Sequence, residues 1–98
     1  MILIVISSSP LKSSIYIQGI EAALNIAESE SDSVAVFLES EFSLSINKES
    51  TDEDHVKRLK QLFLFDVNVY SDIKLCLDNV QCTTRKEIQL KADKVVVF

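Results

Sequence analysis

The chain has 98 residues, 47% of them hydrophobic, and a formal net charge of −5 at pH 7. This length predicts one domain, residues 1–98, that buries about 65% of its unfolded surface on folding. The acidic balance and the lack of a long Lys/Arg cluster argue against direct nucleic-acid binding. No apolar run reaches the ~18 residues of a membrane span and no charged leader precedes the first strand, so we expect a cytoplasmic protein. There Cys76 and Cys82 would be thiols.

The first six residues, MILIVI, form an apolar run with no polar break. Such a run predicts a strand buried on both faces, as in a parallel sheet with helices above and below. A polar elbow over residues 7–12 leads into a helix over 13–28, with Ser13 or Ser14 as its N-cap. The polar residues of this helix form one narrow stripe, so a neighbouring helix or another subunit should cover part of its apolar surface. Gly19 costs about 1 kcal/mol against alanine and predicts a close backbone approach.

Residues 33–38, SVAVFL, predict a second buried strand. The segment 39–50 is the least regular part of the chain, because Phe42, Leu44 and Ile46 alternate with serines. This alternation predicts an edge strand or a loop. Its apolar side could contact a partner, which makes these three residues a candidate interface, or could pack on the domain itself; the pattern leaves both open.

A second helix is predicted from residue 51 or 52 to residue 64. Acidic residues fill its first turn, which suits the helix dipole, and they form i, i+4 pairs as Glu53 with Lys57 and Asp54 with Arg58. The buried face consists of Val56, Leu59 and Phe63. His55, the only histidine, is expected on the charged side, where a lone histidine is usually inert.

Residues 67–70 predict a third strand, and Ser71 or Asp72 would cap a third helix with Ile73, Cys76, Leu77 and Val80 on one face. Thr84 with Glu87 forms a capping box that predicts a short helix to about residue 92, although the alternation over 88–92 leaves a strand open. Residues 94–98 predict the last strand. The order of elements predicts a three-layer α/β/α sandwich with a largely parallel sheet of four to five strands.

Sites in open α/β sheets lie at the carboxyl ends of the strands, which points to a pocket at Ser8 and Ser9 after the first strand and at Tyr70 and Ser71 after the third. The serine loop lacks the glycines of a phosphate-binding or dinucleotide motif, so no cofactor is expected. Two cysteines six positions apart without a histidine are a weak metal signal, and no metal is expected. Cys76 should be a buried small apolar residue, whereas Cys82, in a loop, is a weak catalytic candidate.

Several segments together resemble one family. The first is the opening strand with a small-residue loop ending at Pro10 and a helix carrying Gly19 and Glu21. The others are the second strand with its following apolar segment, VAVFLESEFSLSI over 34–46, the passage KRLKQLFLFDVNVYSD over 57–72, and the ending KADKVVVF. In this order they resemble the small sulfur-relay proteins of the DsrE/DsrF/DsrH group, most closely the TusC/DsrF-like subunit.

The resemblance implies a hetero-oligomer with paralogous TusD/DsrE-like and TusB/DsrH-like subunits. Such complexes pass persulfide sulfur toward 2-thiolation of the tRNA wobble uridine or toward sulfur oxidation. In the catalytic subunit a cysteine at the end of the third strand carries the sulfur. The matching position here is Tyr70, so the resemblance implies a structural subunit without activity of its own. A stand-alone persulfide carrier that uses Cys82 and a homo-oligomeric α/β binding module remain as alternatives.

Overall fold

The computed structural model describes residues 1–30, 32–48 and 54–98. Its centre is a five-stranded sheet in the order β4-β3-β2-β1-β5, in which every pairing is parallel. The strands are β1 (Ile2–Ile6), β2 (Val34–Leu38), β3 (Asn68–Ser71), β4 (Val80–Cys82) and β5 (Lys94–Val97). The predicted α/β architecture with a largely parallel sheet is therefore confirmed.

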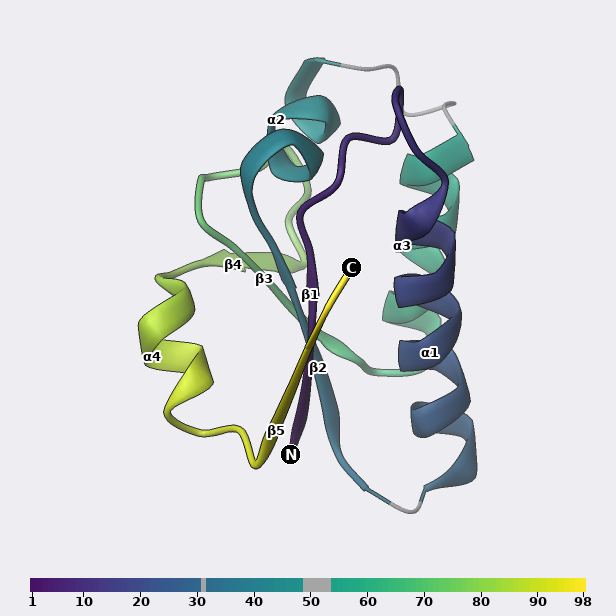
Figure 1. Ribbon diagram of the computed structural model, residues 1–98, viewed down its shortest axis with the longest axis vertical. Coiled ribbons are helices and arrows are strands. Elements are labelled where there is room, and N and C mark those ends of the chain that lie inside the picture. The colour runs from purple at the N-terminus through teal and green to yellow at the C-terminus, as the bar shows by residue number, and fades with distance from the viewer. Residues whose placement is uncertain (31, 49–53) are drawn as a thin grey trace.

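The described residues form four helices: α1 (Ile15–Ser29), α2 (Ser40–Lys48), α3 (Asp54–Leu64) and α4 (Arg85–Gln89). Figure 1 shows α1 and α3 side by side on one face, α4 alone on the opposite face, and α2 at the end of the sheet where the strands finish. None of the described helices is long and apolar enough to cross a membrane.

The first strand lies in the interior of the sheet, between β2 and β5. Its residues alternate between two cores: Ile4 and Ile6 pack on the side of α1 and α3, whereas Leu3 and Val5 pack on the side of α4. All four are at most 1% exposed. The two-sided burial predicted from the unbroken apolar run is confirmed.

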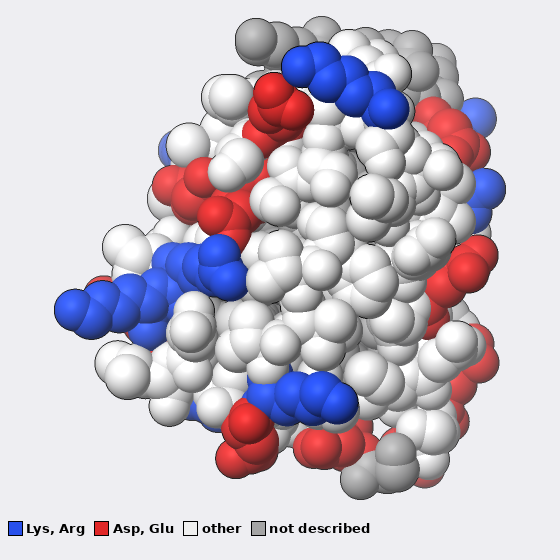
Figure 2. Space-filling view, in the orientation of Figure 1, with Lys and Arg blue, Asp and Glu red and all other residues white. Residues whose placement is uncertain are grey.

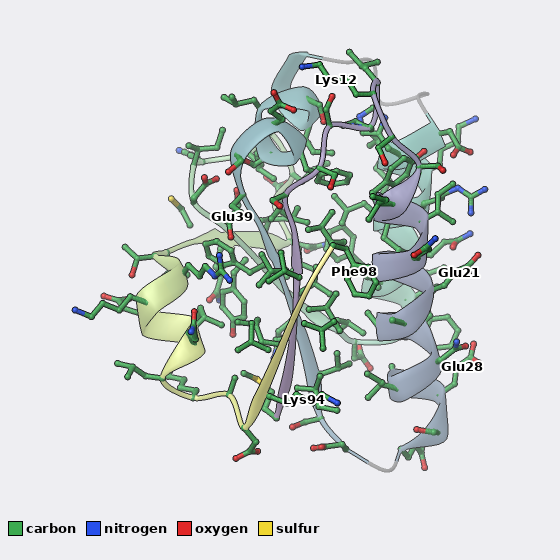
Figure 3. All side chains as sticks on the ribbon, in the orientation of Figure 1. Lys12, Glu21, Glu28, Glu39, Lys94 and Phe98 are labelled. Carbon is green, nitrogen blue, oxygen red and sulfur yellow. The ribbon has the colours of Figure 1, made fainter. Side chains whose placement is uncertain are left out.

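The first helix approaches the sheet most closely at Gly19. A Cβ atom placed there would lie 3.1 Å from Cγ1 of Ile6 and 3.2 Å from the ring of Phe98. Figure 3 shows Phe98 pointing toward α1, while Glu21 and Glu28 point away from the sheet. The expected close approach is thus confirmed, and α3 is the neighbouring helix that packs along α1.

The segment after β2 is a helix, so the prediction of an edge strand or loop over 39–50 was wrong. Phe42 and Ile46, one helical turn apart, are 0% and 2% exposed in the main core, and Leu44 is 47% exposed. Phe42 and Ile46 therefore pack on the domain itself, one of the two alternatives that the sequence left open. The intervening serines hide the helical period and satisfy their hydroxyls locally, since Ser45 Oγ donates to the Phe42 carbonyl at 2.6 Å.

The predicted third helix over residues 71–80 is also absent; this stretch is an irregular connection followed by β4. Ser71 extends β3 and accepts a hydrogen bond from the Ile73 N–H at 3.3 Å, and Val80 then pairs with Val69 across the sheet. Residues 80–82 gain more from pairing with the open edge of β3 than residues 71–80 would gain from forming the helix that the apolar spacing predicts. The N-cap half of the capping box is confirmed, because Thr84 Oγ1 accepts from the Glu87 N–H at 3.3 Å, whereas the Glu87 carboxylate accepts from the Thr83 hydroxyl at 2.8 Å. The helix α4 ends at Gln89 rather than near residue 92.

Candidate functional site

The carboxyl ends of the strands bring the predicted pocket residues to one edge of the sheet. Ser8 and Ser9 follow β1, Tyr70 and Ser71 end β3, and β2 runs between the two pairs. Ser71 is fully buried, and Tyr70 packs on the opposite face, against the core beneath α4. Ser9 Oγ accepts from the Leu11 N–H at 3.3 Å, which shapes the loop. The chain thus places the two pairs of residues at a common edge, with β2 between them.

An aspartate just after β3 joins two elements at this edge. Asp72 Oδ2 accepts from the backbone N–H of Ser40 at 3.2 Å, and Asp72 Oδ1 accepts from the Ser43 hydroxyl at 2.7 Å. Ser40 and Ser43 lie in the first turn of α2, where N–H groups lack intrahelical partners. Asp72, predicted to cap a helix of its own, therefore caps α2 from a neighbouring strand.

An ion pair ties the end of β2 to the helix on the opposite face. Arg85 Nη1, in the first turn of α4, lies 3.0 Å from Glu39 Oε1, and Arg85 Nε is buried without a hydrogen-bond partner among the described residues. Figure 3 shows Glu39 at the centre of this edge. Neither residue stood out in the sequence; a carboxylate directly after a buried strand was the available signal for Glu39.

Both cysteines are exposed. Cys82 is the last residue of β4 and lies in register with Ser71, so its thiol is at the same edge as the predicted pocket residues. Cys76, expected in the core, lies instead in the connection after β3, where Sγ is 3.9 Å from the Ile46 carbonyl oxygen. That prediction failed because it depended on a helix that does not form.

The histidine prediction was also wrong: His55 is 4% exposed. Its ring packs edge-on against Tyr16 and Phe42, and no described residue bonds its Nε2 atom. The chain buries this position because the start of α3 packs against α1 and α2. Among the described residues, no group of three His, Cys, Asp or Glu side chains could hold a metal ion.

Beside this cluster, the predicted pair of Asp54 and Arg58 forms at 2.7 Å, and the guanidinium lowers the pKa of the Asp54 carboxyl. Burial raises the pKa of Tyr16, and its hydroxyl donates to Asp54 at 3.2 Å. The predicted Glu53 partner of Lys57, and Asp52, lie outside the described residues. The Tyr16 hydrogen bond joins α1 to α3, whereas the ion pair of Asp54 and Arg58 lies within α3.

Comparison with known proteins supports the architecture. No family model and no curated protein matches the chain. The crystal structure of the YchN protein from E. coli is similar, with a TM-score of 0.75 and 24% sequence identity, covering 99% of this chain and 97% of that one. At this identity the similarity shows the fold alone, a parallel sheet between helices, as the sequence predicted.

Proposed function

We propose that the chain is a non-catalytic subunit of a sulfur-relay complex. One observation carries the proposal: the end of β3, where the resemblance puts the sulfur carrier, holds Tyr70 and Ser71. A phenol or an alcohol cannot form a persulfide, and Ser71 is fully buried with its hydroxyl engaged by the Ile73 N–H. The resemblance of the sequence and the DsrE-like fold support the relay role.

The outer surface along β5 suits a subunit rather than an isolated protein. This strand is at the edge of the sheet, and Val97 is 52% exposed. Figure 2 shows a broad uncharged area over β5 and α1, with charged side chains mostly around its margin. Uncharged areas of this kind are common where proteins associate. The partners in the proposal are TusD/DsrE-like and TusB/DsrH-like subunits, in tRNA wobble-uridine thiolation or in sulfur oxidation.

Co-expression tests the proposal directly. The tagged chain is produced together with a TusD/DsrE-like and a TusB/DsrH-like subunit, purified, and examined by size-exclusion chromatography with mass detection. We expect a stable complex containing all three chains and no sulfur on this chain after treatment with a persulfide donor. A chain that remains monomeric in their presence, or a homo-oligomer that ignores both partners, contradicts the proposal.

The position of Cys82 favours one alternative, a persulfide carrier. In that reaction the Cys82 thiolate attacks the terminal sulfur of a donor persulfide, the donor S–S bond breaks, the donor leaves as a thiol, and Cys82 holds the new persulfide. Intact mass spectrometry would show one added sulfur atom in the wild type and in Cys76→Ser, but not in Cys82→Ser. Cys76 is a matched control because it is exposed as well.

A further inference from the structure

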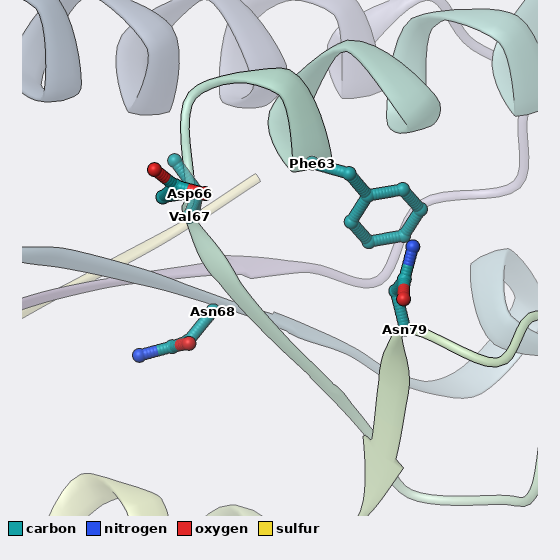
Figure 4. A pocket seen from close by; sticks show the side chains of 5 residues that line it. All are labelled: Phe63, Asp66, Val67, Asn68 and Asn79. Atoms are coloured by element: carbon teal, nitrogen blue, oxygen red, sulfur yellow. The ribbon is translucent and has the colours of Figure 1, made fainter.

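The opposite edge of the sheet, where the strands begin, contains two adjoining hollows of about 310 and 210 Å³. Both are lined by Asp66, Val67 and Asn68, at the start of β3. Figure 4 shows the larger one, with the ring of Phe63 above Asn79, Asp66 in the turn between α3 and β3, and Asn68 at the start of β3. We call the two together the amino-edge groove. Its smaller half adds Ala27, Asp32, Ser33, Val34 and Phe65.

An exposed aromatic side chain lies in this groove. Phe65, which lines the smaller hollow, is 45% exposed, whereas its chain neighbour Leu64 is 82% exposed and lines neither hollow. Apolar side chains at the border of a concave surface favour burial against another molecule. The groove therefore has aromatic and aliphatic walls on which an apolar side chain could pack.

The charges around the groove select the kind of ligand. Helices α1 and α3 both end at this edge, so their partial negative charges point toward it, and neither has a basic residue in its last turn. Acidic residues follow both helix ends: Glu30 after α1, and Asp66 after α3. No described residue bonds the Asp66 carboxylate, while Asp32 lies 3.8 Å from the Met1 ammonium. The field at the groove favours a positively charged ligand and opposes nucleic acid.

We propose that the amino-edge groove docks a segment of a partner protein that carries Lys or Arg side chains around a large apolar residue. The apolar residue packs against Phe63 and Phe65, and the basic side chains meet Asp66 and the two helix ends. This inference goes beyond the proposed function, because it requires no sulfur transfer and names no relay subunit.

The test uses a short fluorescein-labelled peptide that alternates lysine or arginine with leucine or phenylalanine, and a matched peptide with glutamate at every basic position. Fluorescence anisotropy measures binding to the full chain, and amide resonances locate it. We expect the basic peptide to shift resonances at residues 63–68, and the acidic peptide to bind at least about tenfold more weakly. Phe65→Gln should weaken binding of the basic peptide about fivefold, and Asp66→Asn should weaken it about threefold.

Leu11→Gln is the matched control, because Leu11 is 76% exposed at the other end of the molecule and should leave binding unchanged. Thermal melting confirms that each variant is folded. Failure of the basic peptide to bind at about 1 mM, equal binding of the acidic peptide, or equal weakening by Leu11→Gln overturns the proposal. Self-association that Phe65→Gln abolishes would assign the groove to a second copy and also overturn it. Because the assay contains no relay subunit and no persulfide, its failure is distinct from failure of the proposed function.

Discussion

The two edges of the sheet use their polar side chains differently. At the carboxyl edge, Asp72 caps α2, Glu39 pairs with Arg85, and Lys12 lies 3.5 Å from Glu41. At the amino edge the Asp66 carboxylate has no bonding partner among the described residues, and apolar side chains are exposed. The carboxyl edge is where sites usually occur in this architecture, and here its charged side chains hold elements of the fold together. At the opposite edge Asp32 and Asp93 pair with the Met1 ammonium, whereas Asp66 remains available to another molecule.

The largest effect is expected where the carboxyl edge closes over the core. Phe42→Ala should lower the free energy of unfolding by about 3–5 kcal/mol, because Phe42 is fully buried against Tyr16 and His55 and its removal leaves a cavity. Leu44→Ala, two residues along the same helix and half exposed, should cost less than about 1 kcal/mol. Urea unfolding measures both. Similar losses for the two variants would mean that Phe42 does not belong to the core.

A smaller effect is expected from the cap of α2. Asp72→Ala removes the acceptor for the Ser40 N–H and for the buried Ser43 hydroxyl, so stability should fall by about 1–2 kcal/mol. Ser43 retains the Ser40 carbonyl at 3.0 Å, which limits the loss. Asp78→Ala, an exposed aspartate in the turn before β4, is the control and should change stability by less than about 0.5 kcal/mol. An equal loss in the control would rule out capping as the cause.

The sequence alone predicted the elements that depend on local signals, but not the contacts that depend on how those elements pack. Apolar runs predicted β1, β2 and β5, and the capping box predicted the start of α4, because those signals are local. The positions of Phe42 and His55 depend on how α1, α2 and α3 pack together. Likewise, Glu39 meets Arg85, 46 residues away in the chain, only after the sheet is assembled. The amino-edge groove was not predicted, because its residues come from the ends of several elements.

The smallest expected effect is a gain in stability, from a substitution at Asp66 on the amino edge. The N–H of Val67 bonds the Leu62 carbonyl at 3.1 Å and the N–H of Asp66 bonds the Phe63 carbonyl at 3.3 Å, which is the Schellman arrangement at the end of α3. Asp66 occupies its left-handed position, with φ 57°, where glycine is preferred. Asp66→Gly should therefore raise the free energy of unfolding by about 0.5–1 kcal/mol.

Ser40→Gly is the matched variant at the carboxyl edge, since Ser40 has φ 56° and its N–H can still bond Asp72. Ser40→Gly relieves the same left-handed backbone conformation but removes no charge. Asp66→Gly also removes a negative charge from the negative end of α3, so its gain in the free energy of unfolding should be larger by a few tenths of a kcal/mol. Urea unfolding of both variants measures the difference. A loss of stability in Asp66→Gly would mean that the carboxylate supports the fold, as its counterparts at the carboxyl edge do. A gain in stability together with weaker binding of the basic peptide would mean that the aspartate is retained for docking at a cost in stability.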